Sequence, residues 1–309
     1  METTAWDPEG VTTVLDHSGR LSDQSRPPQV DIRAYYKALV GARRIDARLG
    51  ELGLPMWASC AGEEAPLVAT ALVARPEDWI YPGSRDTAIA IARGMDWDEL
   101  ARQVLGRHTG GGPALPGRVC ADALHVAPTT GALGMHLPLA AGHAQALRIA
   151  GRKAVAFASF GEGLTTTGVF AETLALATAN DVPLVLVCRS QQWPGQAPAE
   201  AGVVGDSVAD RARAAGVWSR RVDGADPLVV YATLAAAAER ARDGRGPALV
   251  EAVVTQLVHE PPPHRDPVER LRRHLESTGA WTSTFQDVLD AEAVAHFDRA
   301  LAAQRGARA

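Results

Sequence analysis

The sequence predicts an α/β protein with a doubly wound, mostly parallel sheet and helical extensions. In its second half, short apolar runs alternate with segments of helix length. The apolar runs are continuous rather than alternating with polar residues, which is typical of parallel strands that are covered on both faces. The clearest unit comprises a strand at 153–160, a helix at 165–180 and a strand at 182–188. A unit of this kind joins two parallel strands through a helix.

The first half of the chain is predicted to be mainly helical. Residues 1–30 are polar and contain two prolines near their end, so we expect an irregular arm there. Glycines and prolines cluster in 107–124, which predicts a loop. Apolar residues at helical spacing predict helices over 32–52, 62–74, 84–94, 97–106 and 138–151.

The alternation of helices and strands continues to the end of the second half. A proline-rich loop, "VHEPPPHRDP", follows the last predicted strand, and short helices are expected after it. No internal repeat or long linker interrupts the chain, so residues 31–309 are predicted to form a single domain with a C-terminal helical tail. The remaining predicted elements are a helix at 206–215, a strand at 218–224, a helix at 227–243 and a strand at 247–257.

The composition argues against several classes of protein. The chain has 309 residues and a formal net charge of −5, with both signs of charge interspersed. Such a balance gives no general attraction to nucleic acid or to anionic lipid. The three cysteines are widely spaced, which argues against a disulfide framework or a zinc site. Neither a long apolar run nor the apolar core of a signal peptide is present, so we expect a cytoplasmic protein.

Polar residues follow three of the predicted strands at their carboxyl ends, where sheets of this type bind ligands. Glu162 lies between two glycines after the first of these strands. Arg189 and Gln191 come at the end of the second, and His259 follows the third. A carboxylate that holds a cation, beside an arginine that holds phosphate oxygens, would suit a magnesium-bound diphosphate.

Each of these residues also has an ordinary structural explanation when it is considered alone. A Gly-x-Gly after a strand is common, a single arginine usually forms a surface salt bridge, and a histidine near prolines usually lies in a solvated loop. The dinucleotide fingerprint is incomplete, because Thr166 stands where its third glycine belongs. An ordinary nucleotide-binding protein is therefore a weaker alternative. The combination of these groups at one sheet edge favours a diphosphate site.

Seven segments, in order, give the chain a resemblance to a known family. It resembles the alpha subunit of the thiamine diphosphate-dependent first component of 2-oxoacid dehydrogenase complexes, and most of all the branched-chain 2-oxoacid type. The resemblance extends from about residue 32 to about residue 281 and implies the thiamine diphosphate-binding fold. Its segments are "GEEAPLVATAL", "SRDTAIAIARG", "HVAPTTGALGMHLPLAAGHAQA", "GEGLTTTGVFAETLALATANDVPLVLVCR", "RVDGADPLVVYATLAAA", "PALVEAV" and "RLRRHLESTGAW".

This resemblance implies a site for thiamine diphosphate and Mg²⁺. The metal would be bound by Glu162, by Gln191 and by the backbone carbonyl of Trp193. Arginine side chains would hold the diphosphate, and the backbone around residues 131–133 would hold the aminopyrimidine ring. The cofactor-binding residues implied in this way are Arg85, Gly131, Leu133, Glu162, Gly163, Leu164, Arg189 and His259.

The resemblance further implies a catalytic role for His259, which matches the active-site histidine of the family. At the metal motif the sequence departs from the family pattern. Ser190-Gln191 stand where two asparagines are usual, and Glu162 stands where the shorter aspartate is common. Because Mg²⁺ holds its ligands at short, nearly fixed distances, the pocket must adjust to the longer side chains.

The implied activity is oxidative decarboxylation of a small 2-oxoacid, with transfer of the acyl group to a lipoyl-bearing acyltransferase, the second component. In this family a glutamate of the beta subunit activates the cofactor, so we expect activity only in an α₂β₂ heterotetramer. Small residues in the helix at 138–151 favour close packing between subunits. Two alternatives remain: an alpha-like subunit of another thiamine diphosphate enzyme, acetoin-cleaving or carboligating, and a non-catalytic paralogue that has lost the metal site.

Overall fold

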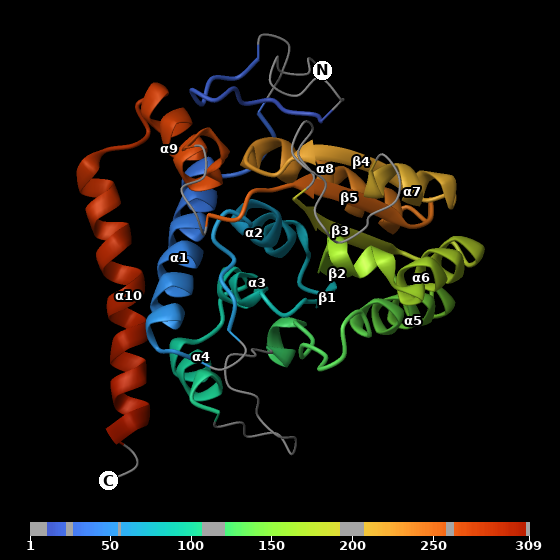
Figure 1. Ribbon diagram of the computed structural model, residues 1–309, viewed down its shortest axis with the longest axis horizontal. Helices are drawn as coiled ribbons and strands as arrows, with labels where there is room; N and C mark the ends of the chain where they lie inside the picture. Colours follow the sequence, from blue (N-terminus) through green and yellow to red (C-terminus); the bar gives the residue numbers. More distant parts are fainter. Residues whose placement is uncertain are drawn as a thin grey trace.

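A five-stranded, all-parallel sheet forms the centre of the molecule, with the strand order β1-β2-β3-β5-β4. Figure 1 shows the computed structural model, which describes residues 11–22, 27–54, 57–106, 121–191, 207–257 and 263–306. The predicted α/β class is confirmed, although β1 was not predicted and β5 ends four residues earlier than expected. The strands are β1 (Trp79–Tyr81), β2 (Ala156–Gly161), β3 (Leu184–Ser190), β4 (Trp218–Asp223) and β5 (Ala248–Val253).

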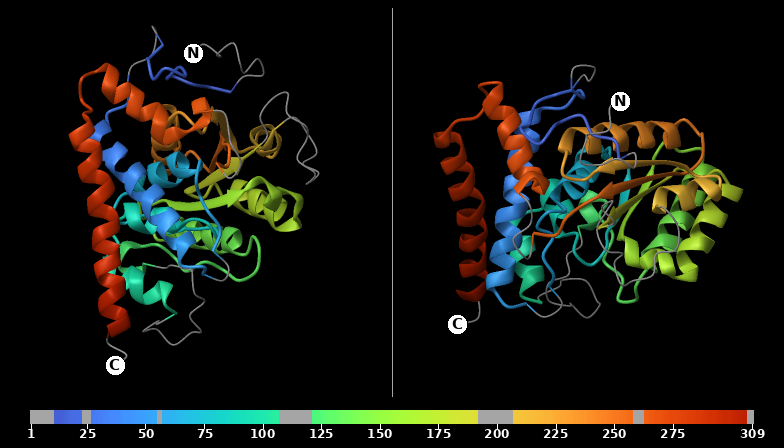
Figure 2. Two further views of the ribbon diagram at one scale, coloured as in Figure 1. Left: turned by 60° about the vertical axis from the view of Figure 1, so that its left-hand side comes forward. Right: turned by 45° about the horizontal axis from the view of Figure 1, so that its top comes forward.

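The path of the chain determines which face of the sheet each helix covers. From β1 to β4 the chain moves across the sheet in one direction, and its connections contain α5 (His136–Ile149), α6 (Gly168–Ala179) and α7 (Val208–Ala214). It then turns back from β4 to β5 through α8 (Pro227–Arg242). Because such crossovers are right-handed, α8 lies on the opposite face from α5, α6 and α7 (Figures 1 and 2).

Side chains along β2 alternate between two separate cores. Phe157 packs into the core that includes α1, α2 and α8, whereas Ala158 and Phe160 pack into the core formed with α5, α6 and α7. All side chains of β3 and β5 are buried as well. The continuous apolar runs in the sequence therefore have a simple cause, because β2, β3 and β5 have no face exposed to water.

A layer of helices extends the core on the α8 side. The prediction of short C-terminal helices is wrong for α10, which has 24 residues and runs beside α1 (Figures 1 and 2). Leu289, Phe297 and Leu301 of α10 are buried in the core. Among the described helices, none is long and apolar enough to cross a membrane. The helices of this layer are α1 (Ile32–Glu51), α2 (Glu64–Val73), α3 (Thr87–Ala92), α4 (Trp97–Val104), α9 (Pro267–Ser277) and α10 (Ser283–Gly306).

The described part of the first thirty residues is irregular but is attached firmly to the domain. Thr12 forms a parallel bridge with Val222 of β4. The buried carboxylate of Asp226 accepts hydrogen bonds of 2.7 Å from the backbone N–H groups of Val14 and Leu15. This segment therefore lies along the outer edge of the sheet, beside β4.

Candidate functional site

A pocket of about 510 Å³ opens at the carboxyl ends of β1, β2 and β3. Its walls come from the loops after β1 and β2, from residues 130–134 before α5, and from the end of β3. Of the ten residues predicted to bind cofactor or metal, Trp193 and His259 lie outside the described residues. The structure brings the other eight together in this pocket: Arg85, Gly131, Leu133, Glu162, Gly163, Leu164, Arg189 and Gln191.

Glu162 lies in the wall of the pocket, directly after β2, at the start of the short 3₁₀ helix η2 (Glu162–Thr166). Burial raises the pKa of Glu162 above its usual value, although hydrogen bonds from its own backbone and from the backbone of Gln191 oppose this effect. A carboxylate with poor access to water gains from a bound cation, so the environment of Glu162 suits a metal ligand.

Two glycines leave open space in the pocket. A Cβ atom added to Gly131 or to Gly163 would meet no other atom within 4 Å, so a ligand can approach the backbone closely at both positions. The predicted helix at 165–180 begins later than expected, because η2 occupies 162–166 and α6 starts only at Gly168. The N-terminus of α6 therefore does not directly follow Gly163.

Arg189 is almost completely buried, with 3% of its side chain exposed. It forms an ion pair with Asp86, and its Nη1 lies 3.2 Å from Oε2 of Glu63. Burial alone would lower the pKa of Arg189, but the charges of Asp86 and Glu63 outweigh this effect and raise it. Within the described structure, Nε of Arg189 has no hydrogen-bond partner. Arg189 is thus a permanently charged residue of the pocket wall, and its buried Nε is a donor without a partner.

Arg85 lies at the mouth of the pocket and is also held by Glu63. Its Nη2 lies 2.9 Å from Oε1 of Glu63, and 27% of its side chain is exposed. Glu63 and Asp86 were not predicted from the sequence, although they belong to the segments "GEEAP" and "SRD". An acid in the first turn of a helix ordinarily interacts with the helix dipole. Glu63 instead precedes α2 without capping it and directs its carboxylate at the arginines.

The Ser190-Gln191 pair is divided between two environments. Ser190 is fully buried at the end of β3, where its side chain forms a hydrogen bond with Glu251 of β5. Gln191, by contrast, lines the pocket. Sequence analysis did not include His136 in the site, yet it also lines the pocket, and its Nε2 lies 3.0 Å from the carbonyl oxygen of Ser159. Burial lowers the pKa of His136, so its ring is neutral near pH 7.

The oxygen donors at the pocket suit Mg²⁺, which prefers carboxylate and amide oxygens. Glu162 and Gln191 supply one group of each kind. In the part of the chain that the structure describes, no three acidic, histidine or cysteine side chains gather into a metal site. The predicted metal set does not need such a cluster, because it consists of one carboxylate, one amide and one backbone carbonyl.

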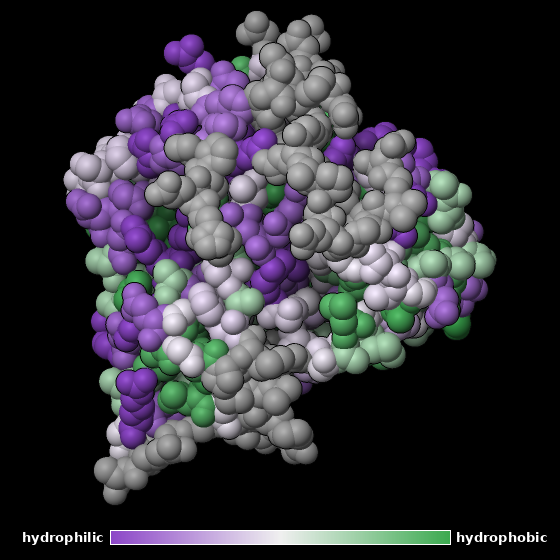
Figure 3. Space-filling model, viewed as in Figure 1, coloured by the Kyte–Doolittle hydropathy of each residue, from purple (hydrophilic) through white to green (hydrophobic). Residues whose placement is uncertain are grey.

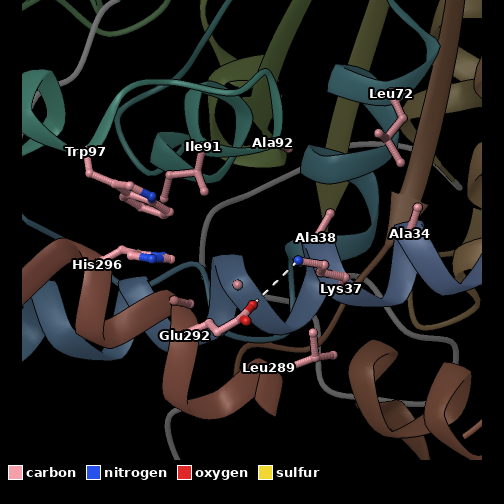
Figure 4. A pocket seen from close by; sticks show the side chains of 12 residues that line it. Ala34, Lys37, Ala38, Leu72, Ile91, Ala92, Trp97, Leu289, Glu292 and His296 are labelled. Carbon is pink, nitrogen blue, oxygen red and sulfur yellow. Dashed lines mark ion pairs between the residues drawn. The ribbon is translucent and has the colours of Figure 1, made fainter. Parts of the chain in front are cut away.

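A second pocket, of about 420 Å³, lies between α1, α2, α3, α4 and α10 (Figure 4). Trp97 and His296 face each other on one side of it, and Lys37 and Glu292 form an ion pair of 3.7 Å nearby. Both members of this ion pair are more than half exposed, so water weakens their attraction. None of the residues predicted from the sequence lines this pocket. The pocket at the sheet edge is therefore the better candidate for a functional site.

Comparison with known proteins shows the family. Residues 50–259, about two thirds of the chain, match the model for the dehydrogenase E1 component. The chain belongs to the dehydrogenase E1 component family. The resemblance found in the sequence motifs is thereby confirmed. Enzymes of this E1 family depend on thiamine diphosphate in general.

Relatives of this E1 family member are named as alpha subunits. The chain is 30% identical over 289 residues to the 3-methyl-2-oxobutanoate dehydrogenase subunit alpha of Mycobacterium tuberculosis, covering 86% of this chain and 76% of that protein. It is 28% identical over 313 residues to the pyruvate dehydrogenase E1 component subunit alpha of Bacillus cereus, covering 94% and 82%. It is 29% identical over 297 residues to the mitochondrial 2-oxoisovalerate dehydrogenase subunit alpha 2 of Arabidopsis thaliana, covering 87% of this chain but only 62% of that protein.

Proposed function

We propose that this chain is the alpha subunit of a thiamine diphosphate-dependent 2-oxoacid dehydrogenase. With a beta subunit, it would decarboxylate a 2-oxoacid oxidatively and pass the acyl group to a lipoyl group of the acyltransferase component. One observation carries the proposal: eight residues predicted as ligands, from distant parts of an E1 family member, line a single pocket at the carboxyl ends of parallel strands.

The residues of the pocket fit the diphosphate and its metal. Arg189 lines the pocket with a permanently charged guanidinium group, which suits the phosphate oxygens of a diphosphate. Arg85, at the mouth, provides a second guanidinium. Glu162 and Gln191 would hold Mg²⁺, with Trp193 as the third protein ligand. When bound, thiamine diphosphate supplies the nucleophilic carbon for attack on the 2-oxo group and stabilises the charge left after CO₂ departs.

The chain itself contributes binding, orientation and one proton-transfer group. Gly131 and Gly163 leave room for the cofactor against the backbone, and the buried Leu164 also lines the pocket. His259 is the residue that we assign to proton donation or hydrogen bonding near the reacting carbon. We assign activation of the cofactor to the beta subunit, and to none of the described residues of this chain.

A beta subunit has a suitable surface on the outer side of α5 and α6. Leu139, Ile149 and Leu176 are large apolar residues with 55%, 77% and 43% of their surface exposed. Figure 3 shows hydrophobic residues gathered over these helices. An exposed apolar surface of this kind marks a contact site. The names of the relatives, which designate alpha subunits, support a beta-type partner, and we propose an α₂β₂ assembly with it.

The small residues of α5 have two different roles. Ala140, Ala141 and Ala144 are fully buried against the sheet and α6. They pack inside the domain, so the expectation that they lie between subunits is wrong. Only Gly142 and Ala146 are exposed on the outer side of the helix, where they allow a partner to approach closely.

Reconstitution tests this function directly. The chain is combined with a beta-type subunit, Mg²⁺ and thiamine diphosphate, and decarboxylation of pyruvate and of branched-chain 2-oxoacids is measured with an artificial electron acceptor. We expect turnover only when both subunits are present. Full activity of the chain alone contradicts the dependence on a beta subunit. Cofactor binding with acetoin cleavage, but without 2-oxoacid turnover, favours the acetoin-type alternative.

A non-catalytic paralogue is one further alternative, because Ser190-Gln191 replace the asparagine pair that is usual in the metal motif. Calorimetry distinguishes the two functions. If the complex with a beta-type subunit binds thiamine diphosphate in the presence of Mg²⁺, the paralogue is excluded. If it binds none under these conditions, the enzyme function is contradicted and the paralogue is supported.

A further inference from the structure

Glu63 is a buried carboxylate that both arginines of the pocket share. Its Oε1 lies 2.9 Å from Nη2 of Arg85, and its Oε2 lies 3.2 Å from Nη1 of Arg189. The side-chain amide of Gln256 donates a further hydrogen bond of 3.2 Å to Oε1. Because Glu63 has no exposed surface, water and salt screen its charge only weakly.

The backbone around Glu63 holds this carboxylate in place. Gly62 has a φ of +93°, and a Cβ atom there would lie 1.9 Å from the carbonyl oxygen of Thr255. The carbonyl oxygen of Ala61 accepts a hydrogen bond of 2.9 Å from the backbone N–H of Leu257. The turn before α2 is therefore packed directly against the chain that leaves β5, which holds the backbone of Glu63 in place.

Among the residues that the structure describes, acidic groups outnumber the arginines around the pocket. Asp86 is paired with Arg189, and Glu162 lines the pocket close enough to Glu63 and Arg85 to be influenced by their charges. Three carboxylates thus accompany two guanidinium groups. A phosphate anion that enters without a cation meets groups whose positive charge is already balanced.

We propose that Glu63 makes this pocket specific for a metal-bound diphosphate over a bare phosphate anion. The inference rests on the proposed function, because it concerns the same pocket. Glu63 is the internal counter-ion of Arg85 and Arg189: it accepts a hydrogen bond from Arg85, forms an ion pair with Arg189 and repels an unaccompanied anion. A divalent cation held by Glu162 and Gln191 reverses this balance and restores attraction for phosphate oxygens.

The expected effect is large enough to measure. At an effective dielectric constant of about 20, one unit charge about 6 Å from an anion changes its affinity by more than about tenfold. Glu63→Gln removes that charge but keeps the size of the side chain and an oxygen that can accept from Arg85. This substitution therefore separates the charge of Glu63 from its hydrogen bond.

The test is calorimetric titration of the full chain with inorganic diphosphate, with and without Mg²⁺. In Glu63→Gln we expect bare diphosphate to bind at least about tenfold tighter than in the unmodified chain. The improvement that Mg²⁺ brings should fall by a similar factor. The decisive quantity is the affinity for diphosphate with Mg²⁺ divided by the affinity without it. If this ratio in Glu63→Gln stays within about threefold of the ratio in the unmodified chain, the inference is overturned, because Glu63 then acts only as a structural partner.

Glu64→Gln is the matched control. Glu64 is the neighbouring residue and is equally buried, but it pairs with Arg43 rather than with Arg85 or Arg189. Because its carboxylate also accepts a hydrogen bond from the Gly62 N–H, this variant reports effects that act through the turn alone. We expect the metal dependence of diphosphate binding to be unchanged in it. An equal change in both variants overturns the role of Glu63 as the counter-ion.

The unmodified chain provides a second measurement, which needs no variant to fold. Without Mg²⁺, bare diphosphate should bind less than about tenfold tighter than inorganic phosphate, because its extra charge gains nothing from a balanced site. A larger gain overturns the inference. If the chain binds no diphosphate even with Mg²⁺, the proposed function fails and this inference fails with it. If Glu63→Gln binds diphosphate with the same dependence on Mg²⁺ as the unmodified chain, only the inference about Glu63 fails and the proposed function stands.

Discussion

Glu162 and Gln191 meet at the ends of neighbouring strands, where the carboxyl of Glu162 accepts a hydrogen bond from the backbone of Gln191. The register of the sheet produces this contact, because Gly161 of β2 pairs with Arg189 of β3. Two residues separated by a whole helix in the sequence thereby present their oxygen atoms to one pocket. Neither side chain is needed for packing of the core, so both can be substituted to test metal binding.

We predict that Glu162→Ala abolishes metal-dependent binding of thiamine diphosphate, with a loss of more than about 100-fold, while the fold is retained. Gln191→Asn should preserve or improve the affinity for Mg²⁺, because the shorter amide is the usual ligand of the family. Calorimetry on the complex with a beta-type subunit measures both, and circular dichroism checks the fold. Unchanged cofactor affinity in Glu162→Ala would show that the metal lies elsewhere.

His259→Ala is expected to lower turnover by at least about 100-fold even at saturating thiamine diphosphate, because an acid–base group supplies about 10²–10⁴-fold. His264→Ala should lose little activity. The ring of His264 lies 4.4 Å from the ring of His17, centroid to centroid, so its loss affects stability instead. Steady-state decarboxylation by the reconstituted enzyme measures both variants. Rescue of His259→Ala by excess cofactor would reduce His259 to a binding residue, and equal losses in both variants would contradict the assignment.

Charge on the outer face of α5 and α6 should weaken assembly. Ile149→Glu and Leu176→Glu each place a charge at an exposed apolar position, and we expect the affinity for a beta-type subunit to fall at least about tenfold. Val288→Glu is the control, because Val288 is 46% exposed but lies on α10. Light scattering across a concentration series measures the assembly. Equal behaviour of all three variants would place the interface on another face.

Two glycines should respond to alanine in opposite directions. Gly41 lies within α1, and an added Cβ atom would meet nothing within 4 Å, so Gly41→Ala should stabilise the protein by about 0.5–1 kcal/mol. Gly62→Ala introduces a clash with the Thr255 carbonyl oxygen at a positive φ and should destabilise by more than about 2 kcal/mol. Urea unfolding gives both values. A destabilised Gly41→Ala would mean that the space beside α1 is normally filled.

Stability should depend on pH through His17. Burial, together with the charge of Arg270, lowers the pKa of His17 from 6.5 to about 4. The unfolded chain therefore takes up this proton first as the pH falls from about 6.5 to about 4, and stability falls over that interval. Because the ring is partly exposed, we expect a contribution of about 1 kcal/mol. Between pH 7 and pH 5, His17→Gln should lose less free energy of unfolding than the unmodified chain. Substitution of the exposed His296 by Gln is the control, and this variant should lose as much as the unmodified chain. Urea unfolding at both pH values measures the difference.

Most of the fold could be predicted because the buried strands carry their own signal. The side chains of β3 from Leu184 to Cys188 alternate between the two cores, which leaves an uninterrupted apolar run in the sequence. The strand β1 gave no such run, since it has only three residues and its first and last are partly exposed. The length of α10 was missed because only four of its residues are buried. Contacts with α1 and α4, rather than a local pattern, support this helix.

The site was predictable where polar residues follow predicted strands. Glu162 and Arg189 could be placed at one sheet edge from strand positions alone, whereas Gly131 and Leu133 came only from family resemblance. Glu63 could not be found in this way. Its position before a helix is ordinary in sequence, and only the packing of the turn at 61–63 against the segment at 255–257 brings it between two arginines.

The strand β5 is the last of the five to be synthesised, yet it lies between β3 and β4. A growing chain that has not reached Ala248 has an open edge on β3, and β4 has only the bridge to Thr12 beside it. Open edges pair readily with other chains, and pairing between distant segments is slow. Nascent chains stalled in this region should therefore aggregate and depend on chaperones until the closing strand emerges from the ribosome.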